Sequence, residues 1–178
     1  GGLTVFRELV KTLPHHDFLY LGDNARTPYG NRSFSVVYKY TLQAVKYLFR
    51  NNCPLIIIAC NTASAKALRS IQQLYLPTTD DEKRVLGVIR PVVEKVSEIT
   101  LTGHVGVLGT TGTVASESYP IELKKWSEGK VRSTAQEACP MWVPLVENNE
   151  MESEGTEYFV RKHIQNILKK DDKLDTLI

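Results

Sequence analysis

The sequence of 178 residues is poor in cysteine. Its three cysteines are Cys53, Cys60 and Cys139, and they do not cluster. This odd, dispersed set argues against both a disulfide framework and a cysteine zinc site, so no metal is expected. We therefore expect free thiols in a reducing compartment, for which the cytoplasm is the simplest choice.

Long hydrophobic runs and charge of one sign are also scarce. The longest apolar run, Leu55 to Ala59, is far too short to cross a bilayer, and the opening residues do not resemble a signal peptide. A net charge of +2 without a basic cluster gives no reason to expect nucleic acid as a partner. With 42% hydrophobic and 24% charged residues, the composition is that of an ordinary globular protein.

What the sequence does contain is an alternation of strand and helix patterns. We expect strands at 17–21, 55–59, 85–89, 104–108, 130–137 and 174–178. Helical patterns lie between them, including one that runs from the loop after residue 108 through about Trp126. Such alternation predicts an α/β fold with parallel sheets. Because the pattern restarts after Pro91, we expect two domains, 1–91 and 92–178.

The most informative stretch is Leu55–Ser64. Its apolar run predicts a strand buried on both faces. Cys60 follows that strand and precedes a helix whose N-cap we expect at Thr62 or Ser64. Open α/β sheets bind ligands at such strand ends, and a helix N-terminus favours a thiolate over a thiol. A small buried cysteine at a strand end would give the same pattern, so position alone leaves both interpretations open.

Two further loops follow expected strands. Gly22–Gly30 carries a dense polar set, and Gly109–Thr113 offers hydroxyls and amides to a small anion, a carboxylate as readily as a phosphate. The glycine spacing of the second loop does not match the dinucleotide fingerprint, and simple helix capping also explains its threonines. No histidine is an obvious partner for Cys60, which disfavours a hydrolase. A thiol among hydroxyls and amides instead suits proton transfer on a substrate that bears a carboxylate.

Several motifs together resemble the glutamate racemase family. They are Gly22-Asp23-Asn24-Ala25-Arg26-Thr27-Pro28-Tyr29-Gly30, Ala59-Cys60-Asn61-Thr62-Ala63-Ser64, Gly109-Thr110-x-x-Thr113, and Cys139-Pro140 with Pro144-Leu145-Val146-Glu147. They occur in the family's order and cover the whole chain. The motif around Cys60 also marks the wider aspartate/glutamate racemase superfamily, whereas the loop that ends at Gly30 is more specific to the glutamate enzyme.

The resemblance implies an isomerase that interconverts L- and D-glutamate without pyridoxal phosphate, metal or other cofactor. It supplies D-glutamate for bacterial peptidoglycan. Two cysteines on opposite faces of the substrate act as base and acid. The implied fold is a pair of doubly wound α/β domains with the active site in the cleft between them. The substrate is the expected partner, with neither nucleic acid nor a membrane, and a homodimer is one assembly that the resemblance allows.

The resemblance also carries over residue roles. Cys60 matches one catalytic thiol, and Asp23 and Glu147 match acidic positions that assist the thiols. Residues that match substrate-binding positions are Pro28, Tyr29, Gly30, Asn61, Thr62, Thr110 and Thr113. Cys53 and Cys139 match neither catalytic cysteine, and we expect them to be structural.

Two family motifs are absent from the sequence. The family's opening Asp-Ser would precede Gly1, and its second catalytic cysteine, in a Cys-Thr-His motif, would follow Ile178. We therefore expect both domains to be incomplete and the chain alone to be inactive. Two alternatives stay open: an aspartate racemase or single-cysteine decarboxylase of the same superfamily, and a non-catalytic α/β domain that binds a small ligand.

Overall fold

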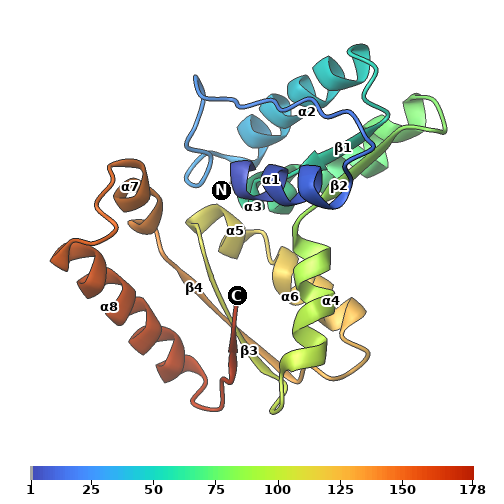
Figure 1. Ribbon diagram of the computed structural model, residues 1–178. Helices are drawn as coiled ribbons and strands as arrows, with labels where there is room; N and C mark the ends of the chain where they lie inside the picture. Colours follow the sequence, from blue (N-terminus) through green and yellow to red (C-terminus); the bar gives the residue numbers. More distant parts are fainter. Residues whose placement is uncertain (1) are drawn as a thin grey trace. The chain divides into compact units, whose positions relative to one another are not determined.

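The computed structural model describes residues 2–178 and divides into two compact units, Gly1–Val88 and Ile89–Ile178 (Figure 1). The elements of the first unit are α1 (Gly2–Thr12), α2 (Phe34–Arg50), β1 (Leu55–Ile58), α3 (Asn61–Ala63), the π-helical turns η1 (Ser64–Leu68) and η2 (Ile71–Tyr75), the 3₁₀ turn η3 (Leu76–Thr78) and β2 (Arg84–Gly87). Those of the second unit are α4 (Ile89–Ile99), β3 (His104–Gly109), α5 (Thr111–Ala115), α6 (Ser118–Trp126), β4 (Ser133–Ala138), α7 (Trp142–Glu147), α8 (Glu154–Lys170) and β5 (Thr176–Leu177).

Each unit contains a parallel sheet. In the first, β1 pairs with β2, and Ile56 lies opposite Val85. In the second, the strand order is β4-β3-β5, and β3 is parallel to both neighbours. The predicted α/β class with parallel sheets is therefore confirmed. Within each sheet the carboxyl ends of the strands share one edge, where the loops after β1 and β3 begin.

The core of the first unit lies between its sheet and helices. Buried side chains come from α2, β1, β2 and the helical segment after Cys60: Val37, Val45, Phe49, Ile56, Ile58, Ala63, Ala67, Ile71 and Val85. The expected burial of β1 on both faces is wrong, because Ile56 and Ile58 are buried while Leu55 is 53% exposed. Leu55 lies on the face turned away from this core, and the side chains alternate as on a half-buried strand.

The strand expected at 17–21 is also absent. The segment is extended, but it pairs with no strand among residues 2–178, and a strand needs a hydrogen-bonded neighbour. Phe18 and Tyr20 instead pack their rings against Phe6 of α1, at centroid distances of 6.0 and 5.3 Å. The apolar pattern is thus satisfied in part by aromatic contacts.

In the second unit, α8 covers one face of the sheet, and α4 with α6 lies on the other (Figure 1). Ile167 on α8, and Val93 and Leu123 on α4 and α6, are fully buried. Gly106 permits close packing on β3, since a Cβ there would approach Leu177 Cδ2 to 2.5 Å. The single helix expected through Trp126 is split at Glu117, whose φ of 55° is left-handed and ends α5.

A search of the described residues for a helix long and apolar enough to cross a membrane finds none.

Candidate active site

Cys60 lies where β1 gives way to the next helical segment. It is the N-cap of α3, and its Sγ accepts a hydrogen bond from the backbone N–H of Ala63 at 3.4 Å. The side chain is exposed and forms no disulfide. A sulfur at an N-cap lies beside free backbone N–H groups and the positive end of the helix dipole. The structure thus presents this thiol to ligands.

The expected N-cap at Thr62 or Ser64 is wrong. Because β1 ends at Ile58, the chain turns earlier and the helical segment begins directly after Cys60. Ser64 is buried and donates its hydroxyl to the Ile58 carbonyl at 2.9 Å. The same oxygen accepts the N–H of Val88 at 3.4 Å. Ser64 therefore ties the helical segment to both strands instead of capping it.

The two predicted binding residues beside Cys60 lie in the same first turn. Asn61 is exposed, whereas Thr62 is 4% exposed. Both take part in hydrogen bonds or other polar contacts within the fold. Asn61 can therefore present its amide to a ligand, while Thr62 supports the turn from inside.

The loop of residues 22–30 is organised around Asp23. The Tyr29 hydroxyl donates to Asp23 Oδ2, and Arg26 Nε donates to Asp23 Oδ1 at 2.8 Å. Arg26 also donates to Gln43 at 2.6 Å, and its guanidinium lies 4.4 Å from the ring centroid of Tyr40 on α2. Gln43 and Tyr40 of α2 therefore hold Arg26 in place, and Arg26 in turn holds Asp23.

These contacts set the charge states of the loop. Burial raises the pKa of Asp23, but the hydrogen bonds from Arg26 and Tyr29 outweigh burial and hold that pKa below its usual value. Burial, followed by the hydrogen bond to Asp23, raises the pKa of Tyr29 well above its usual value, and the charge of Cys60 adds to the rise. Asp23 is thus a carboxylate and Tyr29 a neutral donor at physiological pH.

The structure therefore brings Asp23, Tyr29 and Cys60 together in the first unit. Pro28 and Gly30 flank Tyr29, and the Thr27–Pro28 peptide bond is cis. Sequence reasoning missed the part played by Arg26 as the partner of Asp23. Two sequence signals could have indicated this role. Arg26 lies three residues after Asp23, and a helix rich in tyrosine follows in the sequence.

The second unit repeats this kind of turn with a hydroxyl in place of the thiol. Thr110 is the N-cap of α5, and its Oγ1 accepts the N–H of Thr113 at 3.2 Å. The two hydroxyls are 3.1 Å apart, and Thr113 is 2% exposed. Glu147 is the exposed last residue of α7. The two predicted threonines thus lie together at the end of β3, and Glu147 lies on a separate element.

Cys139 lies in a different environment at the end of β4. It is 2% exposed, and burial, with the nearby charge of Glu137, raises its pKa to about 11. Burial raises the pKa of Glu137, but hydrogen bonds from three side chains outweigh burial and lower that pKa to about 2. The donors are Lys170 at 2.7 Å, His163 at 2.9 Å and Asn166 at 3.0 Å, all on α8.

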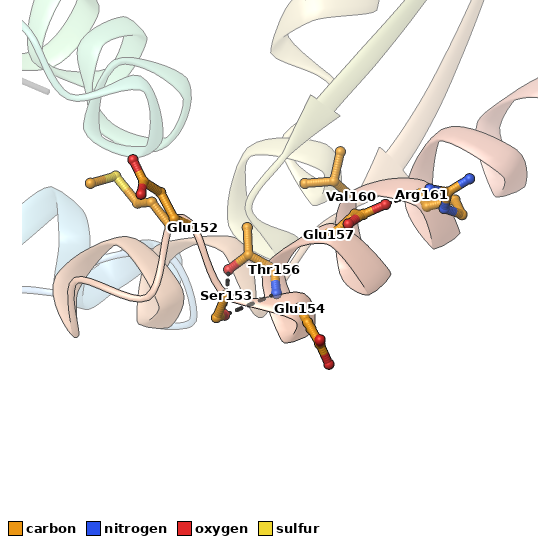
Figure 2. A pocket seen from close by; sticks show the side chains of 8 residues that line it. Glu152, Ser153, Glu154, Thr156, Glu157, Val160 and Arg161 are labelled. Carbon is orange, nitrogen blue, oxygen red and sulfur yellow. Dashed lines mark hydrogen bonds and ion pairs between the residues drawn. The ribbon is translucent and has the colours of Figure 1, made fainter.

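A hollow of about 450 Å³ lies at the start of α8 (Figure 2). Its lining residues are Met151, Glu152, Ser153, Glu154, Thr156, Glu157, Val160 and Arg161. Ser153 caps the helix by accepting the N–H of Thr156 at 3.2 Å, and Arg161 donates to Glu157 at 2.5 Å (Figure 2). No predicted site residue lines this hollow, so the candidate site lies elsewhere.

Fold and site together define a class of protein. Each α/β unit has a parallel sheet and a βα turn that is capped by a side chain. In the first unit the cap is the exposed thiol of Cys60, near the neutral Tyr29 and the Asp23 carboxylate. This is an α/β protein with an exposed thiol at the kind of strand end where open parallel sheets bind ligands.

The comparisons with known proteins point to glutamate racemases. The chain is 39% identical over 178 residues to the glutamate racemase of Persephonella marina, covering all of this chain and 64% of that protein. The glutamate racemase of Bacillus anthracis has the same fold, with a TM-score of 0.86 and 32% identity over 99% of this chain and 62% of that one. That of Francisella tularensis, solved in complex with D-glutamate, gives a TM-score of 0.83 and 29% identity, with coverage of 99% and 62%.

No family model matches the chain. It nevertheless resembles glutamate racemases along its whole length. The chain spans just under two thirds of the length of the curated relatives that it matches. The predicted family resemblance is therefore confirmed.

Proposed function

We propose that this chain is part of a glutamate racemase, an isomerase that interconverts L- and D-glutamate by proton transfer between thiols and the α-carbon. The observation that carries the proposal is the exposed Cys60 thiol at the N-cap after β1, in a chain similar to glutamate racemases from end to end. The complex of the Francisella tularensis enzyme with D-glutamate supports a small amino-acid substrate.

The chemical problem is the weak acidity of the α-proton. In the proposed reaction the Cys60 thiolate takes this proton, and the electron pair of the C–H bond remains on the α-carbon, beside the carboxylate. A second thiol then delivers a proton to the opposite face, which inverts the centre. Amides at a helix N-terminus stabilise both the thiolate and the charge that develops.

Neither Cys53 nor Cys139 is expected to provide the second catalytic thiol. Cys139 is buried, and its pKa of about 11 keeps it protonated at physiological pH. The Sγ of Cys53 lies 3.7 Å from the carbonyl oxygen of Asn51, in the turn after α2 and at the opposite end of β1 from Cys60. The proposal therefore assigns the second thiol to a part of the protein beyond the 178 residues.

The remaining site residues bind or orient in this proposal. Tyr29, held neutral by burial and by Asp23, donates a hydrogen bond to the substrate or orients the loop, and Asp23 assists through it. Pro28 and Gly30 shape this loop, and Asn61 and Thr62 bind the substrate beside the thiol. Thr110 and Thr113 bind the substrate carboxylate, and Glu147 assists the second thiol.

The proposal extends to the protein's role. D-Glutamate made by the enzyme would enter peptidoglycan and so serve cell-wall formation and cell shape. The free thiols support a reducing cytoplasm as the site of the reaction. No cofactor is invoked, and a homodimer is the assembly we propose for the complete protein.

A racemisation assay tests the proposal. The complete protein that contains this chain should convert L-glutamate to D-glutamate, and Cys60→Ser should reduce the rate at least about a hundredfold, because it removes an acid–base group. L-Aspartate, run in parallel, should not be racemised, and preferred turnover of aspartate would replace the proposal with an aspartate racemase. The 178-residue chain alone should be inactive, and activity there would contradict the two-thiol mechanism.

A further inference from the structure

Lys66 is a buried lysine in the first unit. It lies on η1, in the helical segment that Cys60 opens, and it is 8% exposed. Lysine is almost never buried to this extent unless an acidic group pairs with it. Among residues 2–178, however, no ion pair involves Lys66, and burial lowers its pKa.

The contacts of Lys66 indicate why the charge is kept there. Its Nζ donates to the backbone carbonyl of Arg32 at 2.5 Å, and it lies 4.9 Å from the ring centroid of Phe34. Arg32 lies two residues after Gly30, at the end of the loop that contains Pro28 and Tyr29, and precedes Ser33, the N-cap of α2. One hydrogen bond therefore joins the end of this loop to the segment that begins at Cys60.

Burial of the Lys66 ammonium is expected to lower the stability of the fold. Removing an ammonium from water without a counter-charge costs several kcal/mol, of which a hydrogen bond to a carbonyl recovers a part. An apolar side chain of the same length would fill the site without that cost. Residues that lower stability in this way are typical of functional sites.

The other hydrogen bonds and ring contacts of the loop lead elsewhere. The rings of Tyr29 and Tyr40 on α2 lie 6.1 Å apart, and the Arg32 guanidinium lies 5.7 Å from the Tyr40 ring. Arg26 binds Gln43 and stacks on Tyr40, which are both on α2. Arg32 Nε donates back to the Pro28 carbonyl at 3.2 Å, within the loop itself. None of these joins the loop to the helical segment after Cys60. Tyr29 packs against the core to which that segment contributes, and the Lys66 hydrogen bond adds a directed contact to the end of the loop.

We infer that Lys66 is a positioning residue that holds loop 28–32 against the helical segment opened by Cys60 and so keeps Tyr29 in place beside the thiol. The inference rests on the proposed function where it concerns glutamate. The clamp itself is a property of the first unit and can be tested without substrate.

The test compares Lys66→Met with Lys39→Met, a matched control on an exposed position of α2. In Lys66→Met we expect amide hydrogen exchange at residues 29–33 to rise about tenfold or more, while the thermal midpoint stays the same or increases. In the complete protein, kcat/KM for L-glutamate should fall about ten- to a hundredfold, because small displacements of positioning groups are costly. Lys39→Met should change none of these quantities.

The outcomes separate the clamp from the activity. Unchanged exchange in the loop, or faster exchange accompanied by a lower thermal midpoint, would overturn the inference, since the second result describes an ordinary structural residue. Failure of Lys66→Met to fold would also overturn it, because an apolar side chain is expected to be tolerated. If the unaltered complete protein does not racemise glutamate, the proposed function fails, and the exchange experiment still decides the role of Lys66.

Discussion

Cys60 and Cys139 both follow a parallel strand but have opposite environments. Each follows the carboxyl end of a parallel strand, β1 or β4. Cys60 is exposed and its sulfur caps a helical turn. Cys139 is 2% exposed, and its Sγ lies 3.6 Å from the carbonyl oxygen of Glu137, to which it donates. The strand end therefore does not by itself make a thiol reactive.

The difference comes from what surrounds each sulfur. At Cys60 the neighbouring groups are backbone N–H donors and the Tyr29–Asp23 pair, which suit an anion or a polar ligand. At Cys139, burial and the nearby carboxylate of Glu137 both disfavour a negative charge on the sulfur. The same residue type at the same kind of position is thus adapted to chemistry in one unit and to packing in the other.

Alkylation of the thiols should show the largest effect. With iodoacetamide at pH 8, Cys60 should react at least about a hundredfold faster than Cys139, because a thiol with a pKa near 11 is about one-thousandth thiolate at that pH. Peptide mass spectrometry over time measures both rates in one sample. Comparable rates in the folded chain would remove the contrast between the two cysteines.

A second prediction concerns Glu137, the carboxylate beside Cys139. Glu137→Gln should lower the free energy of unfolding by about 2–4 kcal/mol at pH 7, because it weakens a buried set of hydrogen bonds from His163, Asn166 and Lys170. The matched control, Glu152→Gln at an exposed position before α8, should have little effect. Urea unfolding curves measure both.

The same variant has a defined pH dependence. The pKa of Glu137 is about 2 in the folded state against 4.5 as its ordinary value, so its stabilising effect is present above pH 4.5 and is lost as the pH falls towards 2. The difference in stability between the original chain and Glu137→Gln should therefore shrink across that range. A constant difference would show that charge is not its cause. Cys139 should stay unreactive in the variant, because burial remains.

The smallest effects concern the two caps. Thr110→Val should cost about 1 kcal/mol of stability, because it removes a hydroxyl that accepts the N–H of Thr113. Cys60→Ala should cost less than about 0.5 kcal/mol, since sulfur is a weak acceptor. Equal losses in urea unfolding would mean that the thiol contributes to stability as a true cap, which would weaken the case that it is kept for chemistry.

Much of the fold could be predicted because periodicity reports local structure. The run that ends at Ile58 predicted β1, and the alternation of strands and helices predicted the parallel sheets. Predictions that depended on neighbours were wrong. Residues 17–21 have a strand pattern without a partner strand among residues 2–178, and β1 is buried on one face instead of two.

For the site, the sequence by itself determined which residues are candidates and the family that they resemble, because motifs such as Ala59–Ser64 are contiguous. Tertiary structure alone decided how these residues interact. It paired Asp23 with Arg26 and Tyr29, buried Cys139 beside Glu137, and placed the Lys66 ammonium on the Arg32 carbonyl. Exposure, hydrogen bonding and charge state depend on groups far apart in the chain, and the folded structure brings those groups together.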